Sequence, residues 1–170
     1  KGQLAKLAEV PLNAVLTPVK DEKNKNLESF DTRVDCIGPK VSGYFSRPVG
    51  AKPKSLPAVI SLHGAGVRSA GLGSATNWAS QGFLAMDINA HGIDNGKDDA
   101  FYKALAANEL NNYRAIGRDS KEKGYFVGMF LRVKRALDFL CSQPEWDGKT
   151  LIVSGGSQGG FQAFAGAALD

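Results

Sequence analysis

The sequence has few of the features that mark membrane, metal-binding or nucleic-acid-binding proteins. Cysteine occurs only twice, as Cys36 and Cys141, without the close spacing of a zinc site, and we expect both to be small buried residues. No apolar run approaches the roughly 20 residues needed to cross a bilayer, and residues 1–10 lack the hydrophobic block of a secretory signal. The sequence therefore predicts neither a membrane span nor a metal site. Because the chain begins with Lys1 rather than Met, the sequence leaves the compartment open.

Concentrated charge is also scarce. The formal net charge is +4, but Lys and Arg are spread along the chain apart from one basic run at 132–135. The apolar residues around this run repeat at helical spacing: Phe126, Phe130, Val133, Leu137 and Leu140. We therefore expect the basic residues to face solvent on the other side of a helix, and we expect no nucleic-acid binding.

The apolar residues that are present follow the alternation of an α/β protein. Residues 30–36 and the segment KVSGYFSRP (40–48) predict an antiparallel hairpin. Three later apolar runs, in 56–62, 82–88 and 150–154, predict strands of a parallel sheet that is buried on both faces. Helical stretches around 75–81 and at 125–141 lie between them, so right-handed crossovers bring the carboxyl ends of these strands to one edge. The long polar stretch from 94 to 123 predicts an inserted, partly helical excursion at the rim of a substrate site.

The most informative motif is Gly155-Gly156-Ser157-Gln158-Gly159, which fits the G-x-S-x-G pattern of a nucleophile elbow. In an elbow, a strand turns sharply into a helix and holds a reactive serine exposed. Side chains at Gly155 and Gly159 would obstruct that turn. The segment LIVS before the serine predicts the strand, and the Gly- and Ala-rich segment after it predicts the helix. The sequence therefore predicts that Ser157 is a nucleophile.

A second motif, LHGAG (62–66), follows an earlier buried strand and resembles the loop that contributes an oxyanion-hole amide in esterases. We expect the backbone N–H groups of Ala65 and Gln158 to point at the developing oxyanion, with His63 and Gly64 supporting the loop. The alternative is that LHGAG is only a tight loop and that Ser157 is a structural turn residue.

The segments VSGYFSRP, PAVISLHG and PEWDGKTLIVSGGSQGG carry a resemblance to a known family. From about Phe30 onward the chain resembles the α/β-hydrolases, and among them the acetyl xylan esterase and cephalosporin-C deacetylase group, carbohydrate esterase family seven. The resemblance implies an α/β-hydrolase fold with a mostly parallel sheet, helices on both faces and an antiparallel N-terminal hairpin. It implies deacetylation of xylo-oligosaccharides or similar carbohydrates through an acyl-enzyme, without metal or organic cofactor, often in homo-oligomers. Because carbohydrate polymers favour export, the resemblance favours a secreted or periplasmic location over a cytoplasmic one. Residues 1–28 are then an N-terminal extension, and residues 29–170 the N-terminal part of a single hydrolase domain.

Two positions differ from the pattern of that family. His91-Gly92-Ile93 stands where the family carries Arg-Gly-Gln, so the support given by that arginine and glutamine is either absent or supplied by other residues. Ala65 stands where the family has an aromatic residue. We interpret His91 as a possible pocket residue, and Gly156 and Gly160 as further support for the elbow.

The partners that a serine nucleophile needs are not evident. In α/β-hydrolases the acid and the histidine follow the serine, yet both histidines here precede Ser157. His91 is expected two strand spacings, roughly 10 Å, from the serine's strand. Asp147 falls at the opposite end of the sheet, and Asp170 lies at the far end of a helix, roughly 20 Å away. We therefore expect the acid, the base and the remaining strands in a C-terminal part or a companion chain.

Three functional hypotheses follow. The first is a serine esterase that deacetylates carbohydrate. The second is another α/β-hydrolase, with a different ester or a peptide substrate. The third is a non-catalytic, hydrolase-like binding module that has lost the triad. An Asp and then a His in a downstream segment would favour the two enzymes over the third.

Overall fold

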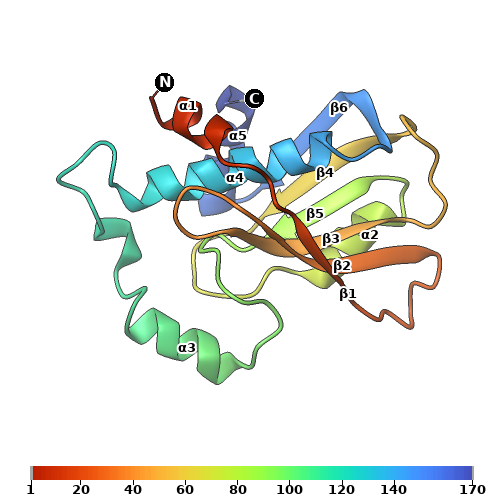
Figure 1. Ribbon diagram of the computed structural model, residues 1–170. Helices are drawn as coiled ribbons and strands as arrows, with labels where there is room; N and C mark the ends of the chain where they lie inside the picture. The colour runs from red at the N-terminus through yellow and green to blue at the C-terminus, as the bar shows by residue number, and fades with distance from the viewer. Residues whose placement is uncertain (1, 170) are drawn as a thin grey trace.

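The computed structural model describes residues 2–169, whose six strands form a single sheet (Figure 1). The strands are β1 (Val15–Pro18), β2 (Leu27–Val34), β3 (Val41–Pro48), β4 (Leu56–Leu62), β5 (Leu84–Ile88) and β6 (Trp146–Gly155). The helices are α1 (Gly2–Glu9), α2 (Leu72–Ala79), α3 (Asp99–Ala107), α4 (Tyr125–Cys141) and α5 (Gln158–Leu169), with a short 3-10 helix η1 (Tyr113–Ala115).

The strand order is β1-β2-β3-β5-β4-β6. The pairs β1–β2, β2–β3 and β3–β5 are antiparallel, whereas β4 is parallel to both β5 and β6. The predicted α/β fold, its antiparallel N-terminal hairpin and its three parallel strands are confirmed. Within the described residues the sheet is mixed rather than mostly parallel, because β1 pairs with β2 and lengthens the antiparallel half.

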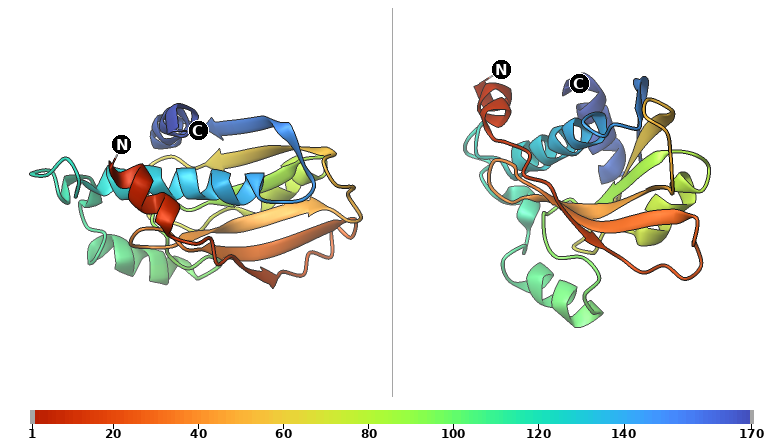
Figure 2. Two further views of the ribbon diagram at one scale, coloured as in Figure 1. Left: turned by 45° about the horizontal axis from the view of Figure 1, so that its top comes forward. Right: turned by 45° about the vertical axis from the view of Figure 1, so that its right-hand side comes forward.

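Helices cover both faces of the sheet. Figure 2 shows α1, α4 and α5 over one face and α2 over the other. Apolar residues of α4 pack against the sheet in the larger core, where the rings of Phe45 and Phe139 meet edge to face at 5.2 Å. A smaller core under α2 holds Val59, Ala79 and Ala85. Burial of these apolar surfaces on both faces is the main stabilising contribution to the fold.

The prediction that the basic run of α4 faces solvent is wrong for its two arginines. Arg132 and Arg135 are only 2% and 4% exposed. The guanidinium of Arg132 donates hydrogen bonds of 3.2 and 2.7 Å to the carbonyl oxygen of Ala90, and Arg135 donates to the carbonyl oxygen of Leu7. Helical periodicity distinguishes the apolar face of a helix from its polar face, but it does not show what covers the polar face. Here the carbonyl groups of Ala90 and Leu7, from distant segments, lie against it. The arginines thus tie α4 to α1 and to the loop after β5.

The cysteines are less buried than expected, since both Cys36 and Cys141 have intermediate exposure. Cys36 follows the end of β2, where partial burial raises the pKa of its thiol. Among the described residues, no helix is long and apolar enough to span a membrane.

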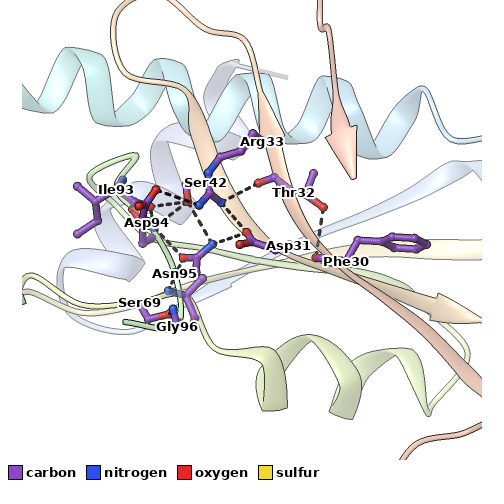
Figure 3. Close-up of polar contacts among 12 residues, drawn as sticks. Phe30, Asp31, Thr32, Arg33, Ser42, Ser69, Ile93, Asp94, Asn95 and Gly96 are labelled. Carbon is purple, nitrogen blue, oxygen red and sulfur yellow. Dashed lines mark hydrogen bonds and ion pairs between the residues drawn. The ribbon is translucent and has the colours of Figure 1, made fainter. Parts of the chain in front are cut away.

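The loop after β5 is fixed to the antiparallel half of the sheet by a buried polar network (Figure 3). The side-chain amide of Asn95 donates to Asp31 at 3.0 Å and to the hydroxyl of Ser42 at 3.1 Å. The Ser42 hydroxyl donates to the carbonyl oxygen of Ile93 at 2.5 Å, and Asn95 Oδ1 accepts the N–H of Ala70 at 3.0 Å. Because buried polar groups are costly unless paired, these bonds hold the loop in one arrangement. The 94–123 excursion, which contains α3 and η1, starts from this anchored loop.

Candidate active site

Ser157 lies at the turn between β6 and α5 and is exposed. Its φ angle is 54°, in the left-handed region that residues with a side chain rarely adopt. Such a conformation costs on the order of 1–3 kcal/mol and persists only where the surroundings impose it. A strand, a left-handed serine and a helix are the parts of a nucleophile elbow.

Two glycines make this turn possible. A Cβ on Gly159 would lie 2.0 Å from the carbonyl oxygen of Leu62, and a Cβ on Gly155 would lie 2.5 Å from the carbonyl carbon of Gly159. A Cβ on Gly156 would meet nothing within 4 Å, and one on Gly160 would approach the Gly155 oxygen at 3.3 Å. Gly155 and Gly159 therefore allow the start of α5 to touch the end of β4. Gly160 lies in a tight but less crowded place, and Gly156 faces open space.

The loop after β4 lies beside the serine. A Cβ on Gly64 would be 3.8 Å from the Cβ of Ser157. A pocket of about 290 Å³ opens next to the serine, lined by Ala65, Arg114, Phe126, Ser157, Gln158 and Phe161. The structure thus brings together Ala65, Ser157 and Gln158. Gln158 is the first residue of α5, where backbone N–H groups have no partner within the helix and the helix dipole favours negative charge.

His63 holds the loop rather than facing the serine. Its Nε2 atom accepts the N–H of Ala90 at 3.0 Å, so the ring proton resides on Nδ1, which lies 2.6 Å from the carbonyl oxygen of Gly64. Burial lowers the pKa of His63. The neutral imidazole therefore links the end of β4 to the loop that follows β5.

His91 is 3% exposed and is not among the residues that line the Ser157 pocket. Its Nε2 atom lies 3.0 Å from the carbonyl oxygen of Gly66, to which it must donate, so Nδ1 accepts from the hydroxyl of Tyr125 at 2.6 Å. Burial lowers the pKa of His91 to about 4. The ring of Tyr113 meets the imidazole edge to face at 4.7 Å. Through these two hydrogen bonds, His91 links Tyr125 at the start of α4 to Gly66 in the loop after β4.

Arg132 supports the loop at His91, where the family that the sequence resembles carries an arginine in the loop itself. Its guanidinium reaches the Ala90 carbonyl, next to His91, from α4 rather than from the loop itself. Support for this loop is thus supplied by other residues.

The sequence did not single out the aromatic and basic side chains around the serine. Tyr113, in η1, is 6% exposed, and its hydroxyl donates a 2.6 Å hydrogen bond to Oε1 of Gln158. Its neighbour Arg114 lines the pocket together with Phe126 and Phe161. The available signal was the length of the 94–123 excursion, which predicted a substrate rim without indicating which residues form it.

The described residues do not supply a base and an acid for Ser157. Among residues 2–169, no hydrogen bond joins His63 or His91 to the serine. Asp147 accepts the N–H groups of Lys149 and Thr150, both at 2.8 Å, which lower the pKa of its carboxyl in the turn near the start of β6, away from the elbow. Asp170 lies outside the described residues. Within the described part of the chain, no group of three His, Cys, Asp or Glu residues could hold a metal ion.

Comparisons with known proteins agree with the fold. The family model for acetyl xylan esterase (AXE1) matches residues 1–170. The acetyl esterase Axe7A of Xylanibacter ruminicola is 31% identical over 165 residues, which cover 91% of this chain and 37% of that protein. A solved acetyl xylan esterase from a Paenibacillus species is 28% identical with a TM-score of 0.82, covering 99% of this chain and 54% of that one.

Acetyl xylan esterase 1 from a Thermoanaerobacterium species has a TM-score of 0.79 over 99% of this chain and 52% of its own, and at 22% identity it shows the shared fold. The chain therefore spans about half the length, or less, of the relatives it matches. Its sequence matches the family model over all 170 residues, and a solved acetyl xylan esterase shares its fold, so the chain belongs to the acetyl xylan esterase (AXE1) family.

Proposed function

We propose that this chain forms the nucleophile half of a serine esterase that removes acetyl groups from acetylated xylan or xylo-oligosaccharides. The observation that carries the proposal is the strained, exposed Ser157 at the head of α5, with Ala65 and Gln158 around the same pocket. A purely structural turn would be more stable with glycine at this φ angle. The strained serine favours an enzyme over a non-catalytic module, because strain of this kind is retained where the side chain is needed.

In the proposed reaction, Ser157 Oγ attacks the acetyl carbonyl carbon while a base takes the hydroxyl proton. The carbonyl oxygen becomes an oxyanion, which the backbone N–H groups of Ala65 and Gln158 stabilise. The C–O bond to the sugar then breaks, the sugar oxygen takes the proton from the base, and an acetyl-serine remains. A water molecule, deprotonated by the same base, attacks this ester and releases acetate and free Ser157.

The base and the acid of this reaction are assigned to a segment outside these 170 residues. Each imidazole of the described chain is held in the neutral form by two main-chain or side-chain partners, so neither His63 nor His91 is free to accept the serine proton. The edge of the sheet at β6 also leaves room for a further segment. A cavity of about 640 Å³ lies along β6 and α5, and Phe164 beside it is 79% exposed. Further strands, from the same protein or a companion chain, would cover this apolar edge.

The test uses the full-length protein that contains this chain. Acetate release from acetylated xylo-oligosaccharides is measured beside a Ser157→Ala variant. Release that falls by a factor of at least about 10³ in the variant supports the proposed nucleophile. Equal release from both proteins would exclude Ser157 as the nucleophile.

A further inference from the structure

The pocket beside Ser157 has a wall that the acyl-transfer chemistry does not use. Phe126 at the start of α4 and Phe161 in α5 pack edge to face, with ring centroids 5.7 Å apart. Phe161 is 54% exposed although it is large and apolar. Exposed aromatic rings in a concave site offer a surface for the apolar faces of a ligand. The rings thus extend the site beyond the space that an acetyl group needs.

A cation stands on the same wall. Arg114 lines the pocket, and among residues 2–169 it forms no ion pair. Its guanidinium carbon lies 5.7 Å from the ring centroid of Tyr113, a cation–π contact. Tyr113 is itself fixed by its hydrogen bond to Gln158. The charge of Arg114 is therefore positioned at the rim of the pocket without a carboxylate from the described chain to neutralise it.

Arginine presents a planar fork of donors that matches a carboxylate. The acetyl ester is neutral in the intact substrate, so a substrate anion bound by Arg114 before the reaction belongs to the alcohol part of the ester. We propose that Arg114 binds a carboxylate on the sugar chain of the substrate, while Phe126 and Phe161 pack against the sugar rings. The preferred substrates are then acetylated oligosaccharides that carry a uronic acid, over neutral ones of the same length. This inference rests on the proposed esterase function and specifies its substrate class.

The experiment compares two acetylated xylo-oligosaccharides of equal length, with and without a uronic acid substituent, using the full-length protein at low salt. The value measured is the ratio of kcat/KM for the acidic substrate to kcat/KM for the neutral one. We expect a ratio well above one in the wild type, lowered roughly fivefold by Arg114→Gln. Arg114→Lys retains the charge but not the fork, so its ratio falls between the two.

The matched control is Lys103→Gln, which removes one exposed positive charge from α3 of the same excursion without touching the pocket. An equal ratio in the wild type and Arg114→Gln, or an equal fall in Arg114→Gln and Lys103→Gln, would overturn the inference. In both of those outcomes the esterase function stands as long as Ser157→Ala abolishes acetate release. A wild type that releases acetate from neither substrate would overturn the inference together with the function.

Discussion

The hydroxyl of Tyr113 donates a 2.6 Å hydrogen bond to the side-chain oxygen of Gln158, 45 residues away. This contact joins the excursion between β5 and α4 to the residue directly after Ser157. The excursion is therefore part of the wall of the site, and its position and that of the elbow depend on each other.

Removing this hydrogen bond should disturb the site more than the fold. We expect Tyr113→Phe to lower the free energy of unfolding by about 1 kcal/mol and kcat/KM by roughly three- to tenfold, because Gln158 loses its tether. Tyr102→Phe is the matched control, since its hydroxyl bonds to Asp94 O and Lys97 N within the same excursion, away from the pocket. It should cost similar stability and leave kcat/KM unchanged. Chemical denaturation and acetate release measure both, and an equal loss of activity in the two variants would contradict the tether.

The backbone strain at Ser157 should be measurable as a difference in stability between two variants at this position. Ser157→Ala and Ser157→Gly both remove the nucleophile, but only glycine adopts a φ angle of 54° without strain. We expect the glycine variant to be more stable than the alanine variant by about 1 kcal/mol, with both inactive. Thermal unfolding of the two proteins checks this. If they unfold at the same temperature, the turn is not strained.

Alanine substitutions at Gly159 and at Gly156 should have very different effects on stability. Gly159→Ala places a methyl group where the Leu62 carbonyl oxygen already lies, so we expect a loss of roughly 3 kcal/mol or more and loss of activity. Gly156→Ala meets open space and should change stability by less than about 1 kcal/mol. Comparable unfolding midpoints for the two variants would contradict the close approach of α5 to β4.

His91 should make stability depend on pH. Its pKa falls from 6.5 in the unfolded chain to about 4 in the fold, because it is buried among Tyr113, Tyr125, Arg132 and His63. Between these pKa values the unfolded chain binds more protons than the folded one. The contribution of His91 to the free energy of unfolding is therefore fully present above about pH 6.5 and is lost as pH decreases toward 4. The slope from this group is about 1.4 kcal/mol per pH unit.

We expect His91→Gln to flatten this slope while costing some stability at pH 7. Part of the slope remains, because burial also lowers the pKa of His63. Urea unfolding of both proteins at pH 7, 6 and 5 measures the difference. An identical slope in the variant would show that His91 does not carry the pH dependence.

The strands, helices and elbow could be predicted because their signals are local. The boundaries of α4 match the sequence prediction, and α5 follows the serine directly as predicted, because the signals for both helices lie within a few turns of chain. The buried state of Arg132 and Arg135 could not be predicted, because it depends on carbonyl groups 42 and 128 residues away. Arg114 was missed for the same reason, since only the folded excursion brings it to the serine.

The approach of Gly155 and Gly159 to the end of β4 has a consequence for how such sequences diverge. Main-chain atoms meet main-chain atoms there, so the place of the serine does not depend on which side chains fill the interior. Core residues can exchange for others of similar volume without moving the nucleophile relative to the neighbouring loop. The solved relative that is only 28% identical nevertheless superimposes with a TM-score of 0.82, as expected for a fold that tolerates such exchanges.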